Sequence, residues 1–281
     1  MDYTLNIRGQ LMSLAQPLVM GILNATPDSF YANSRMQTAD EVAKRARQII
    51  DEGAAIIDIG ACSTRPGSEF ATQQEEMERL RMALSAMRRE LPDAILSVDT
   101  FRPDVARMAV EEYGVDIIND VGTYDTPQEE KEMYRMVSRL NIPYILMSSE
   151  PTLEKTLLFF ADRVQQLRDM GQKDIVLDPG FGFGKTLEQN YELLAQMEKL
   201  QVIELPLLVG VSRKSMIYRL LGTEPSNALN GTTALHAIAL MKGADILRVH
   251  DVKEAAECVK LLSHLTSHPS PLTSHLSPLT P

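Results

Sequence analysis

Short apolar runs recur along the chain at intervals of a few tens of residues. They are rich in Val, Ile and Leu and run continuously, without alternating polar positions, which is typical of strands covered on both faces of a parallel sheet. The segments between them have the spacing of amphipathic helices, and the segment 38–53 ends at Gly53, where a helix C-cap is expected. The eight apolar runs are 18–26, 54–61, 94–100, 116–121, 143–149, 174–180, 206–213 and 245–251.

A strand followed by a helix, repeated eight times, predicts an α/β fold of the (β/α)8 TIM-barrel type over residues 18–262. An open doubly wound sheet is the alternative. The barrel is favoured because polar residues stand at the C-terminal end of nearly every apolar run. In a barrel these ends converge on one mouth, whereas an open sheet spreads them along an edge.

The two ends of the chain lie outside this pattern. Residues 1–17 contain two short strand-like pieces around Arg8 and Gly9, which predicts an N-terminal β-hairpin that closes the barrel bottom. Residues 263–281 repeat short units of Ser, His, Pro, Leu and Thr, and their proline density disfavours a helix. We expect a disordered C-terminal tail there.

Composition and charge narrow the class of protein. A chain of 281 residues with 44% hydrophobic and 23% charged residues is long enough for one large globular domain. Its apolar runs fall short of the roughly 20 residues that cross a bilayer, and its N-terminus does not resemble a signal peptide, so we expect a cytoplasmic protein without a membrane span. The net charge of -10 argues against a nucleic-acid partner. Cys62 and Cys258 lack the spacing of a metal site, and we expect free thiols.

Positive side chains follow several of the predicted strands in this acidic chain. Arg65 follows the second run, Arg213 and Lys214 follow the seventh, and Arg248 and His250 lie at the end of the eighth. Their convergence at the mouth predicts a site for an anion such as phosphate. The alternative is that each arginine pairs with a neighbouring acid at the barrel rim.

Acidic and amide side chains end other strands. Asp99, Asn119 and Asp178 each follow apolar residues, so their oxygens need hydrogen-bond donors. A heterocycle with amidine-like N–H groups, such as a guanine or a pterin, supplies such donors. Salt bridges to Arg213, Lys214 or Arg248 are the alternative. Asn24 ends the first strand, and its amide oxygen can help to hold Mg²⁺ together with substrate phosphate.

The stretch LDPGFGFGKT, residues 177–186, is close to a nucleotide-binding P-loop. The P-loop pattern requires glycine five positions before Gly184, and Pro179 stands there. We therefore interpret Asp178 as a ligand-binding strand end, the glycines as a flexible support for Phe183, and Lys185 as a charge at the rim or at a helix start.

Seven motifs between residues 20 and 252 closely resemble dihydropteroate synthases. They read MGILNATPDSF, IIDIGACSTRPG, SVDT, IIND, LDPGFGFGK, VGVSRKSMI and RVHDV, in this order along the chain. The resemblance implies a (β/α)8 barrel, a homodimer, and an enzyme of folate biosynthesis that sulfonamides inhibit. Such an enzyme joins 6-hydroxymethyl-7,8-dihydropterin diphosphate to 4-aminobenzoate and releases diphosphate, with Mg²⁺ as cofactor.

The resemblance also implies roles for individual residues. Asp99, Lys214 and Arg248 would be the catalytic residues. Diphosphate would contact Asn24, Arg65, Arg248 and His250, with Asn24 also at the metal. 4-Aminobenzoate would lie among Thr64, Pro66, Phe183 and Ser212. The pterin ring would lie among Asp99, Asn119, Met147, Asp178, Gly210, Lys214 and Arg248.

The chemistry expected of such a site needs no protein nucleophile. Departure of diphosphate leaves a delocalised pterin cation, which carboxylates stabilise while Mg²⁺ and the cations hold the leaving group, and the aniline nitrogen then attacks. This agrees with a sequence that has no Ser-His-Asp or Cys-His signature.

Three places depart from the family pattern: Ser148 replaces a usual histidine, Cys62 replaces a usual acid, and the first loop reads YANSR where glycines are common. A methyltetrahydrofolate-binding methyltransferase and a catalytically silent pterin-binding barrel, which could serve as a partner subunit, are the alternatives to synthase activity. The methyltransferase does not need the STRPG, SRKS and RVHD segments. His236, on a predicted helix, is interpreted as a packed core residue.

Overall fold

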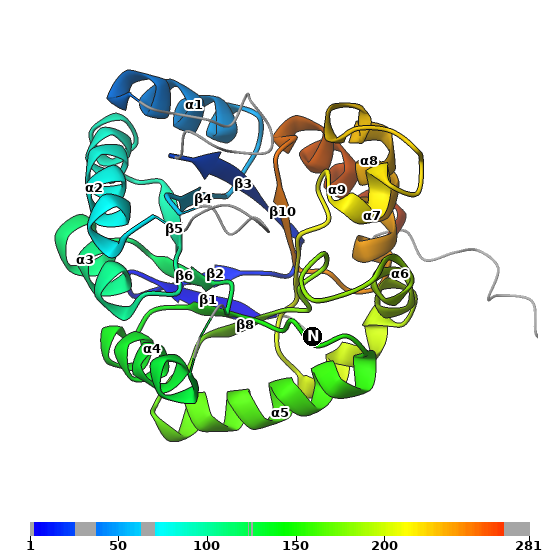
Figure 1. Ribbon diagram of the computed structural model, residues 1–281. Coiled ribbons are helices and arrows are strands. Elements are labelled where there is room, and N and C mark those ends of the chain that lie inside the picture. The colour runs from blue at the N-terminus through cyan, green and yellow to red at the C-terminus, as the bar shows by residue number, and fades with distance from the viewer. Residues whose placement is uncertain (1–2, 26–37, 63–70, 123, 125, 267–281) are drawn as a thin grey trace, which may run out of the picture.

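The computed structural model describes residues 3–25, 38–62, 71–122, 124 and 126–266. Eight parallel strands form a barrel with helices around it (Figure 1). Their spatial order is β8-β7-β6-β5-β4-β3-β10-β9, and a parallel bridge between Leu177 and Leu207 joins the two outer strands. The predicted barrel is therefore confirmed, and the open sheet is not. The barrel strands are β3 Leu18–Asn24, β4 Ile56–Gly60, β5 Ile95–Asp99, β6 Ile117–Asp120, β7 Tyr144–Met147, β8 Ile175–Asp178, β9 Leu208–Val209 and β10 Ile246–Val249.

The helices begin where the sequence provides caps. Thr38, Thr72 and Thr186 each form a capping box, in which the threonine hydroxyl accepts from the backbone N–H three residues on. Among the described helices, none combines the length and the apolar composition that a membrane crossing requires. The helices are α1 Ala39–Asp51, α2 Gln73–Glu90, α3 Pro103–Tyr113, α4 Pro127–Leu140, α5 Leu153–Asp169, α6 Leu187–Ala195, α7 Ser215–Tyr218, α8 Leu229–Met241 and α9 Val252–Thr266, with short 3-10 turns at Met197–Ile203 and Pro225–Asn227.

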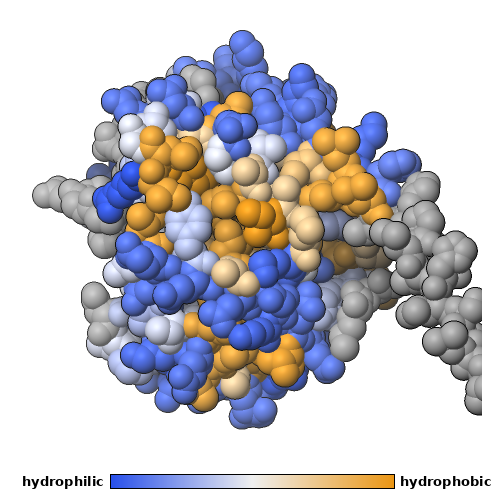
Figure 2. All heavy atoms as spheres, turned by 90° about the vertical axis from the view of Figure 1, so that its right-hand side faces the viewer, coloured by the Kyte–Doolittle hydropathy of each residue, from blue (hydrophilic) through white to orange (hydrophobic). Residues whose placement is uncertain are grey.

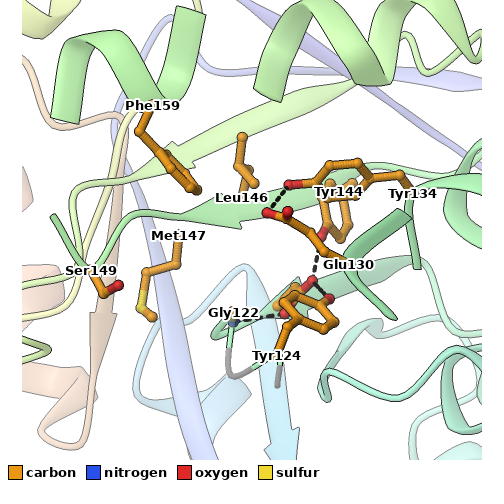
Figure 3. A pocket seen from close by; sticks show the side chains of 10 residues that line it. Gly122, Tyr124, Glu130, Tyr134, Tyr144, Leu146, Met147, Ser149 and Phe159 are labelled. Atoms are coloured by element: carbon orange, nitrogen blue, oxygen red, sulfur yellow. Dashed lines mark hydrogen bonds between the residues drawn. The ribbon is translucent and has the colours of Figure 1, made fainter. Parts of the chain in front are cut away.

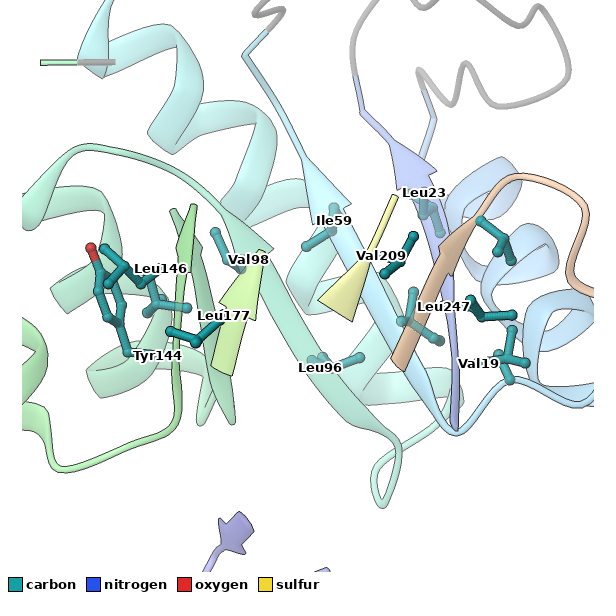
Figure 4. Close-up of a cluster of buried hydrophobic side chains, with 14 of the residues drawn as sticks. Val19, Leu23, Ile59, Leu96, Val98, Tyr144, Leu146, Leu177, Val209 and Leu247 are labelled. Carbon is teal, nitrogen blue, oxygen red and sulfur yellow. The ribbon is translucent and has the colours of Figure 1, made fainter. Parts of the chain in front are cut away.

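The larger hydrophobic core lies between the strands and the surrounding helices. Successive strand side chains point to opposite faces, so one set from each strand packs outward against the helices. Figure 4 shows members of this set, including Val19, Ile59, Val98, Leu177 and Leu247. All five are buried. This double coverage is why the strands appear in the sequence as continuous apolar runs.

A second, smaller core fills the lower end of the barrel interior. Its members come from strands on every side of the barrel, so they point inward, and we call them the lower layer: Met20, Ile56, Ile117, Ile145, Val176, Leu208 and Ile246. The antiparallel hairpin of β1 Thr4–Ile7 and β2 Gln10–Ser13 packs Leu5 and Ile7 onto this layer. Arg8 anchors the hairpin, since its Nε and Nη2 donate to Asp116 at 2.6 and 2.8 Å. The predicted hairpin is present and closes the bottom of the barrel.

The C-terminal helix runs further than the sequence pattern indicated. Helix α9 continues to Thr266, four residues past the expected boundary at 262. The prolines of the repeat first occur at Pro269, so the residues just before it can still complete a helix. The rest of the predicted tail, 267–281, lies outside the described residues.

Candidate active site

Above the lower layer, polar side chains take over the barrel interior. Along most strands the residue two positions after a lower-layer residue faces the same way, because side chains alternate along a strand. We call this set the upper layer: Asp58, Asn119, Met147, Asp178, Gly210 and Arg248, with Asn24 and Asp99 at the strand ends above it. The register agrees, since Asp99 pairs with Asn119 and Met147 pairs with Asp178. Seven predicted residues from separate parts of the barrel thus meet in one place, together with Asp58, which the sequence analysis did not single out.

Arg248 lies at the centre of the upper layer between two carboxylates. Its Nε donates to Oδ2 of Asp58 and its Nη2 donates to Oδ2 of Asp99, both at 2.7 Å. Asp58 also accepts from Nδ2 of Asn119 at 3.1 Å. A lone acid within the apolar run 54–61 was the sequence signal for Asp58, because a carboxylate in such a strand must find donors when it is buried.

Burial and neighbouring charges set the protonation of this cluster. Loss of water around Asp99 raises its pKa to about 7, against the opposing pull of Arg248 and together with repulsion from Asp58. Burial lowers the pKa of Arg248, but the attraction of Asp58 and Asp99 outweighs this and holds the pKa above its ordinary value. The arginine therefore stays charged, while Asp99 changes protonation near neutral pH.

Lys214 and Asp178 lie on another side of the same space. The Lys214 ammonium donates to the carbonyl of Phe181 at 2.7 Å and lies 4.1 Å from the centre of the Phe183 ring. Burial lowers the pKa of Lys214 to about 8, and the charge of Asp178 opposes that shift. Burial also raises the pKa of Asp178, whose Oδ1 accepts from the Gly180 N–H at 2.8 Å. Phe183 is thus placed against Lys214 at the edge of this space, and its predicted contact with 4-aminobenzoate stays a prediction.

The loop after β8 is held by Lys185 and by close backbone contact. Lys185 Nζ donates to the carbonyls of Ser148, Gly180 and Phe183 at 3.1, 3.1 and 3.3 Å. A Cβ on Gly180 would stand 2.1 Å from the Ser148 carbonyl oxygen, and one on Gly184 would stand 2.6 Å from that of Ser149, so glycine permits this approach. Lys185 lies at a helix start, as one of the two predicted alternatives had it, directly before the N-cap Thr186 of α6, and its ammonium joins the loops after β7 and β8. Because the Lys185 ammonium is bound to backbone carbonyls, it does not take the place of a phosphate-binding P-loop lysine.

The remaining predicted cations differ in their surroundings. Arg213 makes a two-pronged salt bridge to Asp251 at 2.8 Å and donates to the carbonyls of Pro225 and Ser226. Arg213 therefore pairs with an acid at the barrel rim, which was the alternative to a role in an anion site. Arg248 is paired too, but with acids of the site itself.

Ser212 and His250 lie together above β10. Ser212 Oγ accepts from the His250 backbone N–H at 3.1 Å and lies 3.1 Å from its Nδ1. A hydroxyl that accepts from the backbone can donate its own hydrogen to Nδ1, which puts the ring proton on Nε2. Burial lowers the pKa of His250 to about 3, with help from the charge of Arg248. His250 is therefore a neutral hydrogen-bond donor near neutral pH, and the expectation that it adds positive charge was wrong.

A pocket lies beside the upper layer, between the segments that follow β6 and β7 (Figure 3). Its wall includes Met147 and Ser149, and at its back Tyr124 and Tyr144 donate to Asp120. Burial raises the pKa of Asp120 to about 6. Tyr134 donates to Glu130 at 2.8 Å in the same wall. The polar groups of this wall satisfy one another, and they fix the strand end that carries Asn119.

The departures from the family pattern have local effects. Ser148 is fully buried, and its Oγ accepts from the Glu150 N–H at 3.2 Å, so it shapes the turn after β7. Cys62 and Cys258 are free thiols, as predicted. His236 is 2% exposed, and burial lowers its pKa to about 4, in agreement with a packed core residue.

Some predicted site residues cannot be placed. Thr64, Arg65 and Pro66 lie outside the described residues. Within the described ranges, no group of three or more His, Cys, Asp or Glu side chains is arranged to hold a metal ion. Oxygens of Asn24 and Asp99 lie 3.5 and 3.9 Å from the point that a Cβ on Gly60 would occupy, so Gly60 leaves room beside two oxygen donors. Hard oxygen donors suit Mg²⁺, which keeps several waters and binds few protein groups.

Comparisons with known proteins agree with this geometry. The chain matches the family described as pterin binding enzyme over residues 20–250. It is 37% identical over 252 residues to dihydropteroate synthase of Clostridium beijerinckii, which covers 86% of this chain and 92% of that protein. The structure of Xanthomonas albilineans dihydropteroate synthase with 4-aminobenzoic acid is similar at a TM-score of 0.86, with 33% identity over 96% of this chain and 100% of the other. The Yersinia pestis enzyme in a sulfonamide drug complex gives 0.87, with 36% identity over 95% and 100%.

Proposed function

This chain belongs to the pterin-binding enzymes as a member of the dihydropteroate synthase family, and from that premise we propose how its barrel mouth performs the reaction. The reaction joins 6-hydroxymethyl-7,8-dihydropterin diphosphate to 4-aminobenzoate and yields 7,8-dihydropteroate and diphosphate. The observation that carries the proposal is the upper layer, where Arg248 lies between Asp58 and Asp99 with the Asn119 amide beside it. An apolar floor below and charged groups above suit a flat, polar heterocycle.

The pterin ring is assigned to the upper layer. Asp99 and Asp178 can accept from the amidine-like N–H groups of the ring, and the amide of Asn119 can bond to its edge. Gly210 and Met147 offer an uncharged wall, and a Cβ on Gly210 would lie 3.9 Å from Cβ of Arg248, so Gly210 lies beside the base of the Arg248 side chain. Lys214 and Arg248 complete the enclosure. In this arrangement each polar edge of the ring has a buried partner.

The chemical step uses charge placement. The C–O bond to diphosphate breaks, its electron pair leaves with the diphosphate, and the ring is left as a delocalised cation. Asp99 and Asp178 favour that cation in a site of low dielectric, whereas in water the same charges would act weakly. The nitrogen of 4-aminobenzoate then bonds to the methylene carbon and loses a proton. Arg248 is assigned to the departing oxygens as well as to the ring face.

Diphosphate is assigned to the strand ends above the ring. His250 can donate from Nε2 to a phosphate oxygen, and Asn24 lies where its amide oxygen can bind a cation carried by the diphosphate. Mg²⁺ is the proposed cofactor, held by Asn24 and phosphate oxygens, and when bound it neutralises charge on the leaving group. Arg65 is assigned to the same phosphates.

The second substrate is assigned to the space over Phe183. The ring of Phe183 rests on the Lys214 ammonium, so one cation can contact both an aromatic wall and the carboxylate of 4-aminobenzoate. Ser212, with Thr64 and Pro66, completes this subsite. The proposed domains are the hairpin at 1–17, a barrel domain that runs from 18 to the end of α9 at Thr266 instead of to 262, and the remainder of the predicted tail.

One experiment tests the function. Purified protein is incubated with dihydropterin diphosphate, 4-aminobenzoate and Mg²⁺, and dihydropteroate is detected by chromatography. We expect product only when both substrates are present. A folded protein that binds pterin and forms no product would be the silent barrel. Transfer of a methyl group from methyltetrahydrofolate, with no dihydropteroate formed, would indicate the methyltransferase.

We also propose that the enzyme is a homodimer through the face formed by α7, α8 and α9. Figure 2 shows apolar side chains gathered on that side of the molecule. Large exposed apolar patches mark interaction surfaces. Sedimentation velocity of the wild type and of Met241→Glu tests this, with a dimer expected for the first and a monomer for the second. The exposed members are Leu220, Leu221, Ile238, Met241, Leu261 and Leu265.

A cytoplasmic location is part of the same proposal. It is supported by the two free thiols, Cys62 and Cys258, because reduced cysteines are typical of that compartment. Fractionation of the source cells tests it.

A further inference from the structure

Asp58 is a buried carboxylate to which neither the motifs nor the proposed reaction assigns a task. It lies in the middle of β4 and is 0% exposed. One oxygen, Oδ2, accepts from Arg248 Nε at 2.7 Å and from Asn119 Nδ2 at 3.1 Å. These donors come from β10 and β6, which lie on different sides of β4 in the barrel. A single oxygen atom therefore connects two of the groups proposed to hold the pterin.

The contact with Asn119 fixes which end of the amide faces the ligand. Two donors already point at Oδ2 of Asp58, so this oxygen carries no proton and can only accept. The amide must therefore turn its NH₂ group toward Asp58, which leaves the carbonyl oxygen of Asn119 for an N–H of the ring. With the amide turned the other way, the ring would meet a donor, and two oxygens would face each other inside the barrel.

The contact with Arg248 has a second consequence. The hydrogen bonds to Asp58 and Asp99 occupy the edge of the guanidinium that carries Nε and Nη2. Under the proposed function, Asp99 must also bind the cationic pterin ring. Asp58 lies deeper in β4, two residues below Gly60, which is the residue that pairs with Asp99. When Asp99 turns to the ligand, Asp58 is the carboxylate that still holds the arginine.

We propose that Asp58 is a positioning residue, which orients the Asn119 amide and retains Arg248 while Asp99 engages the pterin. This inference rests on the proposed function and names a residue through which that function acts. It predicts that loss of the Asp58 carboxylate weakens pterin binding more than it affects 4-aminobenzoate. A merely structural ion pair would affect both substrates alike.

The test compares Asp58→Asn with a matched control, Ser97→Ala. Ser97 pairs with Asp58 in the register of β4 and β5, is 0% exposed, and its hydroxyl has no hydrogen-bond partner among the described residues. Binding of 6-hydroxymethylpterin is measured by fluorescence, and the KM of each substrate is measured by product formation. We expect Asp58→Asn to weaken pterin binding by about tenfold or more, as loss of a bond to a charged group does, and to change the KM for 4-aminobenzoate by less than about twofold. Ser97→Ala should keep both values within about twofold.

A second comparison does not depend on the folding of Asp58→Asn. Asn119→Asp places two carboxylates against each other, and Asp58→Asn added to it restores a complementary pair in reverse. We expect the double variant to bind pterin about fivefold tighter than Asn119→Asp alone, in line with coupling between contacting residues. Wild-type pterin affinity in Asp58→Asn, an equal rise in both KM values, or a double variant no better than Asn119→Asp overturns the positioning role. Absence of product from the wild type would instead overturn the proposed function.

Discussion

The barrel interior has two layers that differ in almost every physical property although the same strands build both. Ile56, Ile117 and Ile246 belong to the lower layer, and two residues later the same strands carry Asp58, Asn119 and Arg248. The distance between layers is roughly 6–7 Å along a strand. Over that distance the interior changes from an apolar core to a network of buried ions.

The difference shows how the barrel separates stability from function. The lower layer removes apolar surface from water, which favours folding in proportion to the area buried. The upper layer and the adjoining Lys214 take charged groups out of water, which opposes folding. The raised pKa of Asp178 and the lowered pKa of Lys214 are signs of that cost. A lower-layer mutation should therefore lower stability alone. An upper-layer mutation should lower activity, and it should lower stability as well only where it leaves a buried charge without its partner.

The largest effect is expected from Arg248→Met, because it removes the cation that the upper layer encloses. Asp58 and Asp99 would then face each other without a partner, which should cost about 3–5 kcal/mol of unfolding free energy. Loss of a positioned charge at the reacting group should also lower kcat/KM by about 10²–10³. Urea unfolding and steady-state kinetics measure the two losses. A variant that is as stable as the wild type would contradict the central place given to this ion pair.

A paired comparison of Ile246→Ala with Asp178→Asn tests the layers directly. Ile246→Ala opens a cavity in the lower layer and should cost about 2–5 kcal/mol of unfolding free energy, with kcat/KM of the folded enzyme nearly unchanged. Burial raises the pKa of Asp178 in the folded state, so its contribution to stability is present below the unfolded pKa and is lost as the pH rises through the folded value. Near neutral pH, Asp178→Asn should therefore leave stability equal or higher, while kcat/KM falls by about 10²-fold.

Urea unfolding gives the unfolding free energy of the two variants, and steady-state kinetics gives their kcat/KM. If Asp178→Asn destabilises the fold as much as Ile246→Ala does, the two layers do not divide stability from function.

The pH dependence of kcat/KM is the next test, because Asp99 and Lys214, two groups beside the proposed ring site, change protonation near neutral pH. Asp99 gains a proton below pH of about 7, its raised pKa, and Lys214 loses one above about 8, its lowered pKa. The proposed active form carries Asp99 ionised and Lys214 protonated, so kcat/KM for the pterin substrate should be bell-shaped and fall by about tenfold per pH unit on each side.

Lys214→Arg serves as the control for the alkaline limb. A guanidinium stays charged throughout this range, so the residual activity of that variant should lack the fall above pH of about 8. An unchanged alkaline limb would assign that titration to another group.

The smallest effect is expected from Lys185→Met, which lies outside both layers. Without the ammonium, the carbonyls of Ser148, Gly180 and Phe183 lose a shared donor, and the loop that carries Phe183 loosens. We expect the KM for 4-aminobenzoate to rise by about three- to tenfold, equivalent to one net hydrogen bond, with the pterin KM little changed. Lys155→Met on the exposed surface of α5 is the matched control. Equal changes in both KM values would show that the loop acts on the whole site.

The fold could be predicted from the sequence because each barrel strand is covered on both sides. The run 174–180 therefore has consecutive apolar residues at 175–177 with no polar position between them, and the polar residue that follows, Asp178, marks the mouth. The site was less predictable, because the order of residues in the sequence does not show which charged side chains will pair across the barrel. Arg213 and Arg248 both follow strands, yet one meets Asp251 and the other meets Asp58, and only the folded geometry distinguishes them. Asp58 itself was hidden inside a strand whose other residues are apolar.

The hairpin at the bottom of the barrel also limits the routes by which ligands enter and leave the site. With Leu5 and Ile7 sealed onto the lower layer, the far end is a dead end, and the mouth serves for both arrival and departure. Under the proposed assignment the pterin lies deeper than 4-aminobenzoate, so an early 4-aminobenzoate would block its way. The architecture therefore favours an ordered sequence in which the deeper substrate binds first, and dihydropteroate withdraws with its pterin end last.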